Sequence, residues 1–178
     1  SREEVAQIVT LPKSIAKLTS VRTLTVYGSQ LVRIPPEIGA MTSLESFTPY
    51  TSYRLHWFPY EITRCLGLRS STVSTRALYG NYKMRWPFPR LAPSSRPPRA
   101  HGQLETRAVR NCSVCDAPFL DEQRHRVWIT RLVASDVLPL LVNACSEACV
   151  ASLPPGHEGY VATPHRGGPD VTQPKRRF

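Results

Sequence analysis

The chain has 178 residues, of which 41% are hydrophobic, and it carries a formal net charge of +10. This composition is typical of a folded protein with one domain or two small ones. No apolar run approaches the roughly 18 residues that a membrane span needs, and the first ten residues lack the basic and apolar regions of a secretory signal. We therefore expect a cytoplasmic protein without a membrane span, and a first residue other than Met leaves open that the sequence is a fragment.

The excess positive charge lies in the first part of the chain. Residues 1–110 hold 16 Lys and Arg against 6 Asp and Glu, whereas residues 111–178 hold 7 of each. Within the first part, residues 64–110 carry 10 basic residues and a single acidic one, Glu105. Such a stretch could contact an acidic protein, a nucleic acid or an anionic lipid. A charge run that only keeps the chain in solution is the commoner case.

Between residues 5 and 80 an apolar pattern recurs at offsets of 23 and 24 residues. The aligned segments are LPKSIAKLTSVRTLTV (11–26), IPPEIGAMTSLESFTP (34–49) and FPYEITRCLGLRSSTV (58–73). This period, with L-x-x-L-x-L at its centre, resembles the leucine-rich repeat family, in the form whose convex side begins L-P-x-x-I. The resemblance implies an α/β fold: a short solenoid of about three coils over residues 1–86, closed by a C-terminal cap.

The third repeat departs from the family pattern. Ser29, Ser52 and Arg76 stand where the family has an Asn that bonds the turn backbone, and Ser71 occupies an apolar column. We expect the array to end there, with Trp86 and Phe88 folded back over the last repeat. The alternative for this region is a nucleic-acid-binding patch made by Arg76, Lys83, Arg85, Arg90, Arg96 and Arg99.

The family binds proteins on the concave face, through strand residues that flank the buried leucines. The resemblance carries this role to nine residues: Thr23, Thr25, Tyr27, Ser46, Thr48, Tyr50, Ser70, Thr72 and Ser74. Tyrosine supplies rigid contact area and one polar group, which suits an interface. The alternative is that Thr and Tyr merely favour strands.

Four of the five cysteines form two close pairs, Cys112-x2-Cys115 and Cys145-x3-Cys149. Two such pairs supply the four thiolates of a closed tetrahedral zinc site, and such a site is structural because no position stays open for water or substrate. An iron–sulfur cluster is the main alternative. Two apolar runs, 125–133 and 136–144, predict a hairpin, and a helix should start near Ser146. Knuckle, hairpin and helix together resemble a treble-clef zinc finger, whereas Cys65 fits an apolar column of the repeats.

Composition divides the chain into four parts: the repeats with their cap (1–86), a Pro/Arg-rich linker (87–109), a zinc-binding module (110–153) and a flexible Pro/Gly-rich basic tail (154–178). No histidine forms a recognisable catalytic partnership and no phosphate-binding loop is present, so we expect neither an enzyme nor a small-molecule substrate. The function that we predict is a protein–protein interaction module with one structural zinc ion. The alternative is a nucleic-acid-binding protein that uses residues 64–110 and the zinc finger.

Overall fold

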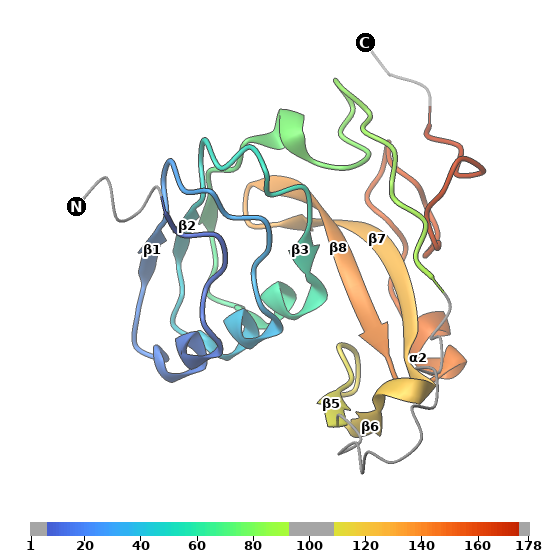
Figure 1. Cartoon of the computed structure of the whole chain (residues 1–178), viewed down its shortest axis with the longest axis horizontal. Coiled ribbons are helices and arrows are strands. Elements are labelled where there is room, and N and C mark those ends of the chain that lie inside the picture. Colours follow the sequence, from blue (N-terminus) through green and yellow to red (C-terminus); the bar gives the residue numbers. More distant parts are fainter. Residues whose placement is uncertain (1–6, 93–108, 175–178) are drawn as a thin grey trace, which may run out of the picture.

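A computed structural model describes residues 7–92 and 109–174 of the chain. The described strands form three small sheets, ordered β1-β2-β4, β3-β8-β7 and β5-β6. Figure 1 shows the parallel strands at one side, the long β7–β8 hairpin beside them, and β5, β6 and α2 near one end of that hairpin.

The first sheet joins equivalent segments of the repeated pattern. Its strands, β1 (Thr23–Thr25), β2 (Ser46–Thr48) and β4 (Ser70–Ser71), run parallel. In its register Leu24 pairs with Phe47, and Phe47 with Ser71. These three residues share one column of the sequence alignment, so the offsets of 23 and 24 residues are confirmed here.

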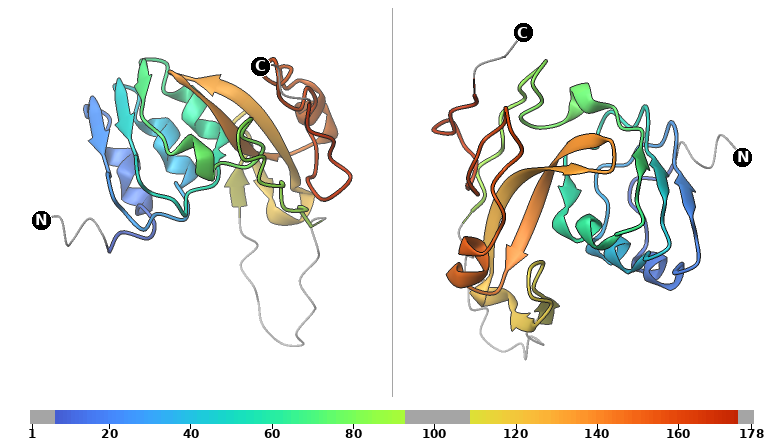
Figure 2. Two further views of the ribbon diagram at one scale, coloured as in Figure 1. Left: turned by 90° about the horizontal axis from the view of Figure 1, so that it is seen from above. Right: turned by 180° about the vertical axis from the view of Figure 1, so that it is seen from behind.

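Each of the first three 3-10 turns follows a proline. The turns are η1 (Lys13–Lys17), η2 (Pro36–Ala40) and η3 (Tyr60–Arg64), and their N-caps Pro12, Pro35 and Pro59 have extended backbone. Proline suits this place because its fixed φ angle and missing N–H cost nothing before a helical turn. Each turn buries one isoleucine, and the three turns lie in a row at the same end of the parallel strands (Figures 1 and 2). A shorter turn, η4 (Thr75–Ala77), follows β4.

The second sheet contains the predicted hairpin. Strands β7 (His125–Val133) and β8 (Asp136–Ala144) pair antiparallel, as the two apolar runs predicted. A short strand from the repeat region, β3 (Phe58–Pro59), pairs in parallel with β8, with Phe58 opposite Leu140. The remaining elements surround the cysteines: β5 (Val109–Asn111), β6 (Pro118–Leu120), η5 (Asp121–Gln123) and α2 (Glu147–Ala151).

One hydrophobic core runs through both regions. It extends from Leu11 in the first repeat to Leu153 after α2, and it includes Phe47 and Phe58, whose rings meet edge to face at 6.2 Å. Because this one cluster includes side chains from the repeat region and from the hairpin, the two regions share a core.

The predicted fold class is therefore wrong. A three-coil solenoid followed by a small separate module was expected, but the described residues form short sheets of mixed strand direction with one α-helix, and no solenoid is evident in them. One physical reason is that β3, from another part of the repeat, pairs with β8 and so joins the repeat region to the hairpin in a second sheet. Strand β4 has only two residues, and Ser71 within it bonds to Ser135 in the β7–β8 turn: Ser71 N–H donates to Ser135 Oγ at 3.0 Å.

The two aromatic residues of the predicted cap, Trp86 and Phe88, lie in different environments. Phe88 is buried, but it packs with Leu91 against Trp128 of β7 in a second, smaller cluster. Trp86 stays 47% exposed, and its indole N–H donates to Arg76 O at 3.0 Å. The edge of the parallel sheet is therefore met by the hairpin turn instead of by these aromatics.

Residues of the predicted tail lie along the outer strand of the hairpin. His165 and Trp128 exchange two backbone hydrogen bonds, of 2.7 and 3.1 Å. Gly168 N–H donates to Phe88 O at 2.8 Å, and Figures 1 and 2 show the red C-terminal part of the described chain beside the light-green segment. The four domain boundaries drawn from composition remain a prediction.

Candidate metal centre

The four predicted cysteines come together at the end of the hairpin. All four Sγ atoms of Cys112, Cys115, Cys145 and Cys149 lie within 4.8 Å of one another. Cys145 Sγ is 3.7 Å from Cys115 Sγ and 3.6 Å from Cys149 Sγ. The cluster is therefore a site that could hold a metal ion, and among the described residues no other group of three or more His, Cys, Asp or Glu side chains could do so.

Local backbone geometry places each pair. After Cys112 the chain turns back on itself: Asp116 adopts a positive φ of 62°, and its N–H donates to Cys112 O at 3.0 Å. The second pair straddles the start of α2, where Ser146 is the N-cap and its hydroxyl accepts from Cys149 N–H at 3.2 Å. This cap confirms the predicted helix start, and it fixes Cys149 on the first turn beside Cys145.

Backbone N–H groups point at the innermost sulfur. Val114 N–H and Cys145 N–H both donate to Cys112 Sγ at 3.4 Å. Burial alone would raise the pKa of Cys112, but these N–H donors, with that of Cys115, favour the thiolate and lower the pKa to about 7. A thiolate with a lowered pKa is the form that binds a metal ion.

Cys115 and Cys145 resist ionisation, unlike Cys112. The hydrogen bond shared with Cys149, followed by burial, raises the pKa of Cys145 to about 12. Thiols this close resist ionisation together because like charges repel, and a bound cation removes that repulsion. The distances of 3.6 and 3.7 Å agree with the ~3.8 Å between sulfurs in a tetrahedral shell with metal–sulfur bonds of about 2.3 Å.

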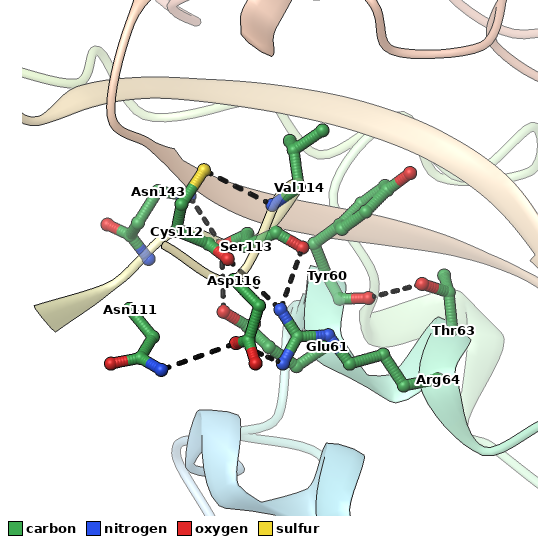
Figure 3. Close-up of polar contacts among 10 residues, drawn as sticks. All are labelled: Tyr60, Glu61, Thr63, Arg64, Asn111, Cys112, Ser113, Val114, Asp116 and Asn143. Carbon is green, nitrogen blue, oxygen red and sulfur yellow. Dashed lines mark hydrogen bonds and ion pairs between the residues drawn. The ribbon is translucent and has the colours of Figure 1, made fainter. Parts of the chain in front are cut away.

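The centre is fastened to the repeat region by two residues of η3. Arg64 donates to Cys112 O at 3.0 Å, to Ser113 O at 3.2 Å and to Asp116 Oδ1 at 2.9 Å. Glu61, only 4% exposed, accepts from the Ser113 hydroxyl at 2.7 Å. Figure 3 shows Arg64 lying between Asp116 and the turn that contains Cys112 and Ser113.

A single serine connects this attachment to the hairpin. The Ser113 hydroxyl donates to Glu61 and accepts from Asn143 N–H of β8 at 2.9 Å. Burial raises the pKa of Glu61, and the Ser113 hydrogen bond offsets only part of that effect. Sequence analysis missed Glu61, Arg64 and Ser113, because the aligned repeat segments all carry charged residues and nothing distinguishes Glu61 and Arg64 from ordinary surface charges.

Apart from Ser74, the predicted binding-face residues lie on the parallel strands or, like Tyr27, Tyr50 and Thr72, one or two residues after them. Tyr27 and Tyr50 are 51% and 43% exposed, and their ring centroids are 5.9 Å apart. The other exposed or half-buried members are Thr23, Thr25, Ser46, Thr48, Ser70 and Thr72.

Ser74 is the exception on this face, because it is buried at 7% exposure. Its hydroxyl accepts from Thr51 N–H at 2.8 Å. Ser29 and Ser52 are buried as well, with hydroxyls 2.7 Å apart. In the third repeat, Ser74 therefore makes the side-chain hydrogen bond to the turn backbone that the alignment assigned to Arg76.

The predicted basic patch is only partly described. Arg76, Lys83 and Arg90 are exposed and Arg85 is half-buried, whereas Arg96 and Arg99 lie outside the described residues. Arg90 is paired with Asp170.

Cys65 is buried as predicted, and burial raises the pKa of its thiol to about 11, which makes it an unreactive core residue.

Comparisons with known proteins add no family. No family model, curated protein or solved structure matches this chain. The resemblance to leucine-rich repeats therefore has no support from them. In the described part of the chain, no helix has the length and apolar character needed to cross a membrane.

Proposed function

We propose that the four-cysteine centre binds one structural zinc ion. Four sulfur ligands of the chain fill a tetrahedral shell, which is the arrangement of closed zinc sites. The knuckle, hairpin and helix around them are similar to a treble-clef finger. Because Arg64 and Glu61 attach the same turn to the repeat region, zinc also stabilises the contact between the two regions.

Metal content and thermal unfolding of the full chain test this proposal. Protein purified without added metal should contain about one zinc per chain, and removal of zinc by a chelator should lower the melting temperature by several degrees. Cys149→Ser should abolish retention of zinc, whereas Cys65→Ser should leave it unchanged. Iron and acid-labile sulfide in place of zinc would assign the site to an iron–sulfur cluster instead.

We further propose that the exposed face of the β1-β2-β4 sheet binds a partner protein. The observation that carries this proposal is the pair Tyr27 and Tyr50, two neighbouring rings left largely exposed beside Thr and Ser side chains. Tyrosine is among the residues that are enriched at the energetic centres of protein interfaces. The protein then acts as a non-enzymatic interaction module.

Affinity capture with matched tyrosine variants tests the proposed face. The bait is the full chain, compared with Tyr27→Ala/Tyr50→Ala and with a control, Tyr53→Ala, which removes a tyrosine that is 66% exposed and is not one of the nine predicted binding-face residues. A partner of this face should bind the double variant at least about 30-fold more weakly, as expected for hot-spot residues, and bind the control normally. Equal binding of every captured protein to both variants would remove the face from consideration, and capture of nucleic acid alone would favour the basic region.

A further inference from the structure

A pocket of about 510 Å³ lies next to the metal centre and is not part of the sulfur cluster. Its walls come from η1, η2 and η3 of the repeat region on one side and from the turn around Asp116 on the other. Charged side chains of both signs line it, so the groups that are still free to bind a ligand decide its chemistry.

The cations of the pocket already face acidic or carbonyl oxygens of the chain. Arg64 is bonded to Asp116 and to the carbonyl oxygens of the Cys112 turn. Arg110 Nε donates to Asp121 Oδ1 at 2.6 Å. The Lys13 side chain is 88% exposed, and its Nζ approaches Glu37 Oε1 only to 3.9 Å. An anionic ligand would therefore have to compete with existing ion pairs.

Two carboxylate oxygens in the pocket have no partner. Oε2 of Glu61 and Oε2 of Glu37 are both buried without a hydrogen bond in the described structure. Glu61 uses its other oxygen for Ser113, and Glu37 turns its other oxygen toward Lys13. A buried carboxylate oxygen without a donor is costly, so these two atoms indicate a missing group that carries N–H bonds and positive charge.

The repeat places the two carboxylates in the wall of the same pocket. Glu37 is the second residue of η2 and Glu61 is the second residue of η3, so they occupy equivalent positions in adjacent turns. Gly39 permits the turns to approach this closely, because a Cβ there would lie 2.7 Å from Glu61 O. Burial is the main cause that raises the pKa of the Glu61 carboxyl, and the charge on Glu37 adds to it.

We propose that this pocket binds an organic cation, the guanidinium or ammonium group of a ligand, between Glu37 and Glu61. Either group supplies several N–H donors and one positive charge, which the two free oxygens can share. A Mg²⁺ or Ca²⁺ ion suits the pocket less well, because such ions take six or more oxygen ligands and Asp116 is already paired with Arg64. The site is separate from the tyrosine face, and neither proposal depends on the other.

An NMR titration of the zinc-loaded full chain tests the site. The side-chain carboxyl carbons of glutamate are labelled, and the probes are acetylated, amidated Gly-Arg-Gly and Gly-Lys-Gly tripeptides, methylguanidinium, and a Gly-citrulline-Gly tripeptide as the neutral control. We expect saturable shifts of the Glu37 and Glu61 signals with the cationic probes and none with citrulline. Methylguanidinium binding as well as Gly-Arg-Gly assigns the site to the cationic group alone, whereas tighter tripeptide binding assigns it to a peptide side chain.

Substitutions of the two glutamates test whether their carboxylates bind the cation. Glu61→Gln keeps an acceptor for Ser113 and Glu37→Gln changes a side chain that is partly exposed, so both should fold. Each should weaken binding of the preferred cation by about tenfold, equal to ~1.4 kcal/mol, whereas Glu45→Gln, which removes an exposed carboxylate paired with Arg22, should not. Lys13→Met should bind equally or more tightly because a competing cation is gone. Unchanged affinity in both pocket variants, equal binding of the citrulline peptide, no saturable shift with any cation, or displacement of the cation by millimolar Mg²⁺ or Ca²⁺ would overturn the proposal.

Discussion

Arg64 donates a hydrogen bond of 3.0 Å to the backbone carbonyl oxygen of Cys112, and so a residue of the repeat region holds the first cysteine of the candidate metal centre in place. The same guanidinium bonds Ser113 O and Asp116, which encloses the knuckle turn from one side. Partners of this kind restrict the geometry of a ligand and tune its affinity for the metal.

Replacing Arg64 should therefore weaken the metal centre. Arg64→Lys keeps the charge but loses the planar fork, so we expect zinc affinity to fall by about 10-fold or more and the free energy of unfolding to fall by about 1–3 kcal/mol. Zinc competition with a chromophoric chelator and denaturant unfolding measure both. Arg54→Lys changes an exposed arginine and is the control. Unaltered zinc affinity would show that the Arg64 hydrogen bonds play no part in holding the knuckle.

The buried serine pair of the parallel sheet should show coupled energetics. Ser29 Oγ and Ser52 Oγ are 2.7 Å apart, and Ser52 Oγ also donates to Val26 O at 3.4 Å. Ser52→Ala leaves the Ser29 hydroxyl buried without its partner, so it should cost about 1–3 kcal/mol. The double alanine variant should cost less than the sum of the two single variants. Strict additivity in denaturant unfolding would contradict the hydrogen bond.

A methyl group at Gly39 should be poorly tolerated. A Cβ there would meet Glu61 O at 2.7 Å, and backbone of η3 cannot move aside without disturbing Glu61 and Arg64. We expect Gly39→Ala to destabilise the fold by about 1–3 kcal/mol in spite of the higher helix propensity of alanine. Gly67→Ala is the matched control, because its nearest contact would be an ordinary 3.4 Å. Equal stability of the two variants would mean that η2 and η3 are not closely stacked.

Acid should destabilise the protein through His165. Burial lowers the pKa of His165 from 6.5 to about 4. Its Nδ1 accepts from Gly167 N–H at 3.1 Å, and its Nε2 is buried without a partner in the described structure. Between these pH values the unfolded chain binds the proton and the folded chain does not, so stability falls as pH falls from about 6.5 toward 4.

The size of this effect should be on the order of 1 kcal/mol, because the ring is only partly shielded from water. His165→Asn retains an acceptor for Gly167 and cannot ionise. Melting temperatures measured between pH 7 and pH 5 should therefore fall less steeply in the variant than in the wild type. Parallel curves would show that His165 gains its proton equally in both states. Loss of zinc in acid affects both proteins and cancels in the comparison.

Features that local spacing determines could be predicted from the sequence. The cysteine cluster, the β7–β8 hairpin and the cap at Ser146 each depend on residues close together in the chain, and each is present. The pairing of Leu24 with Phe47 was predictable for the same reason, because a period of 23 residues sets which strands are neighbours.

The features that escaped prediction depend on contacts between distant segments. Phe58 and Pro59 have no sequence feature of a strand, because the repeat pattern assigns them to a segment without ladder hydrogen bonds. They form a strand because β8 pairs with them. Similarly, no sequence marker separates Glu61 and Arg64 from ordinary surface charges, because the Cys112 turn that covers them is about 50 residues away in the chain. Ser74 was misplaced because the third repeat is irregular and has no sequence marker for its turn.

The parallel pairing of Phe58 with Leu140 joins a strand that is synthesised early to one that is synthesised late. The partners are 82 residues apart (140 − 58), so the ribosome makes the whole repeat region well before its neighbouring strand exists. During that interval β3 has no partner, and the apolar residues that β8 later covers stay in contact with water. A long-range pairing of this kind slows folding, and the nascent chain is therefore most open to chaperones and to aggregation before β8 emerges.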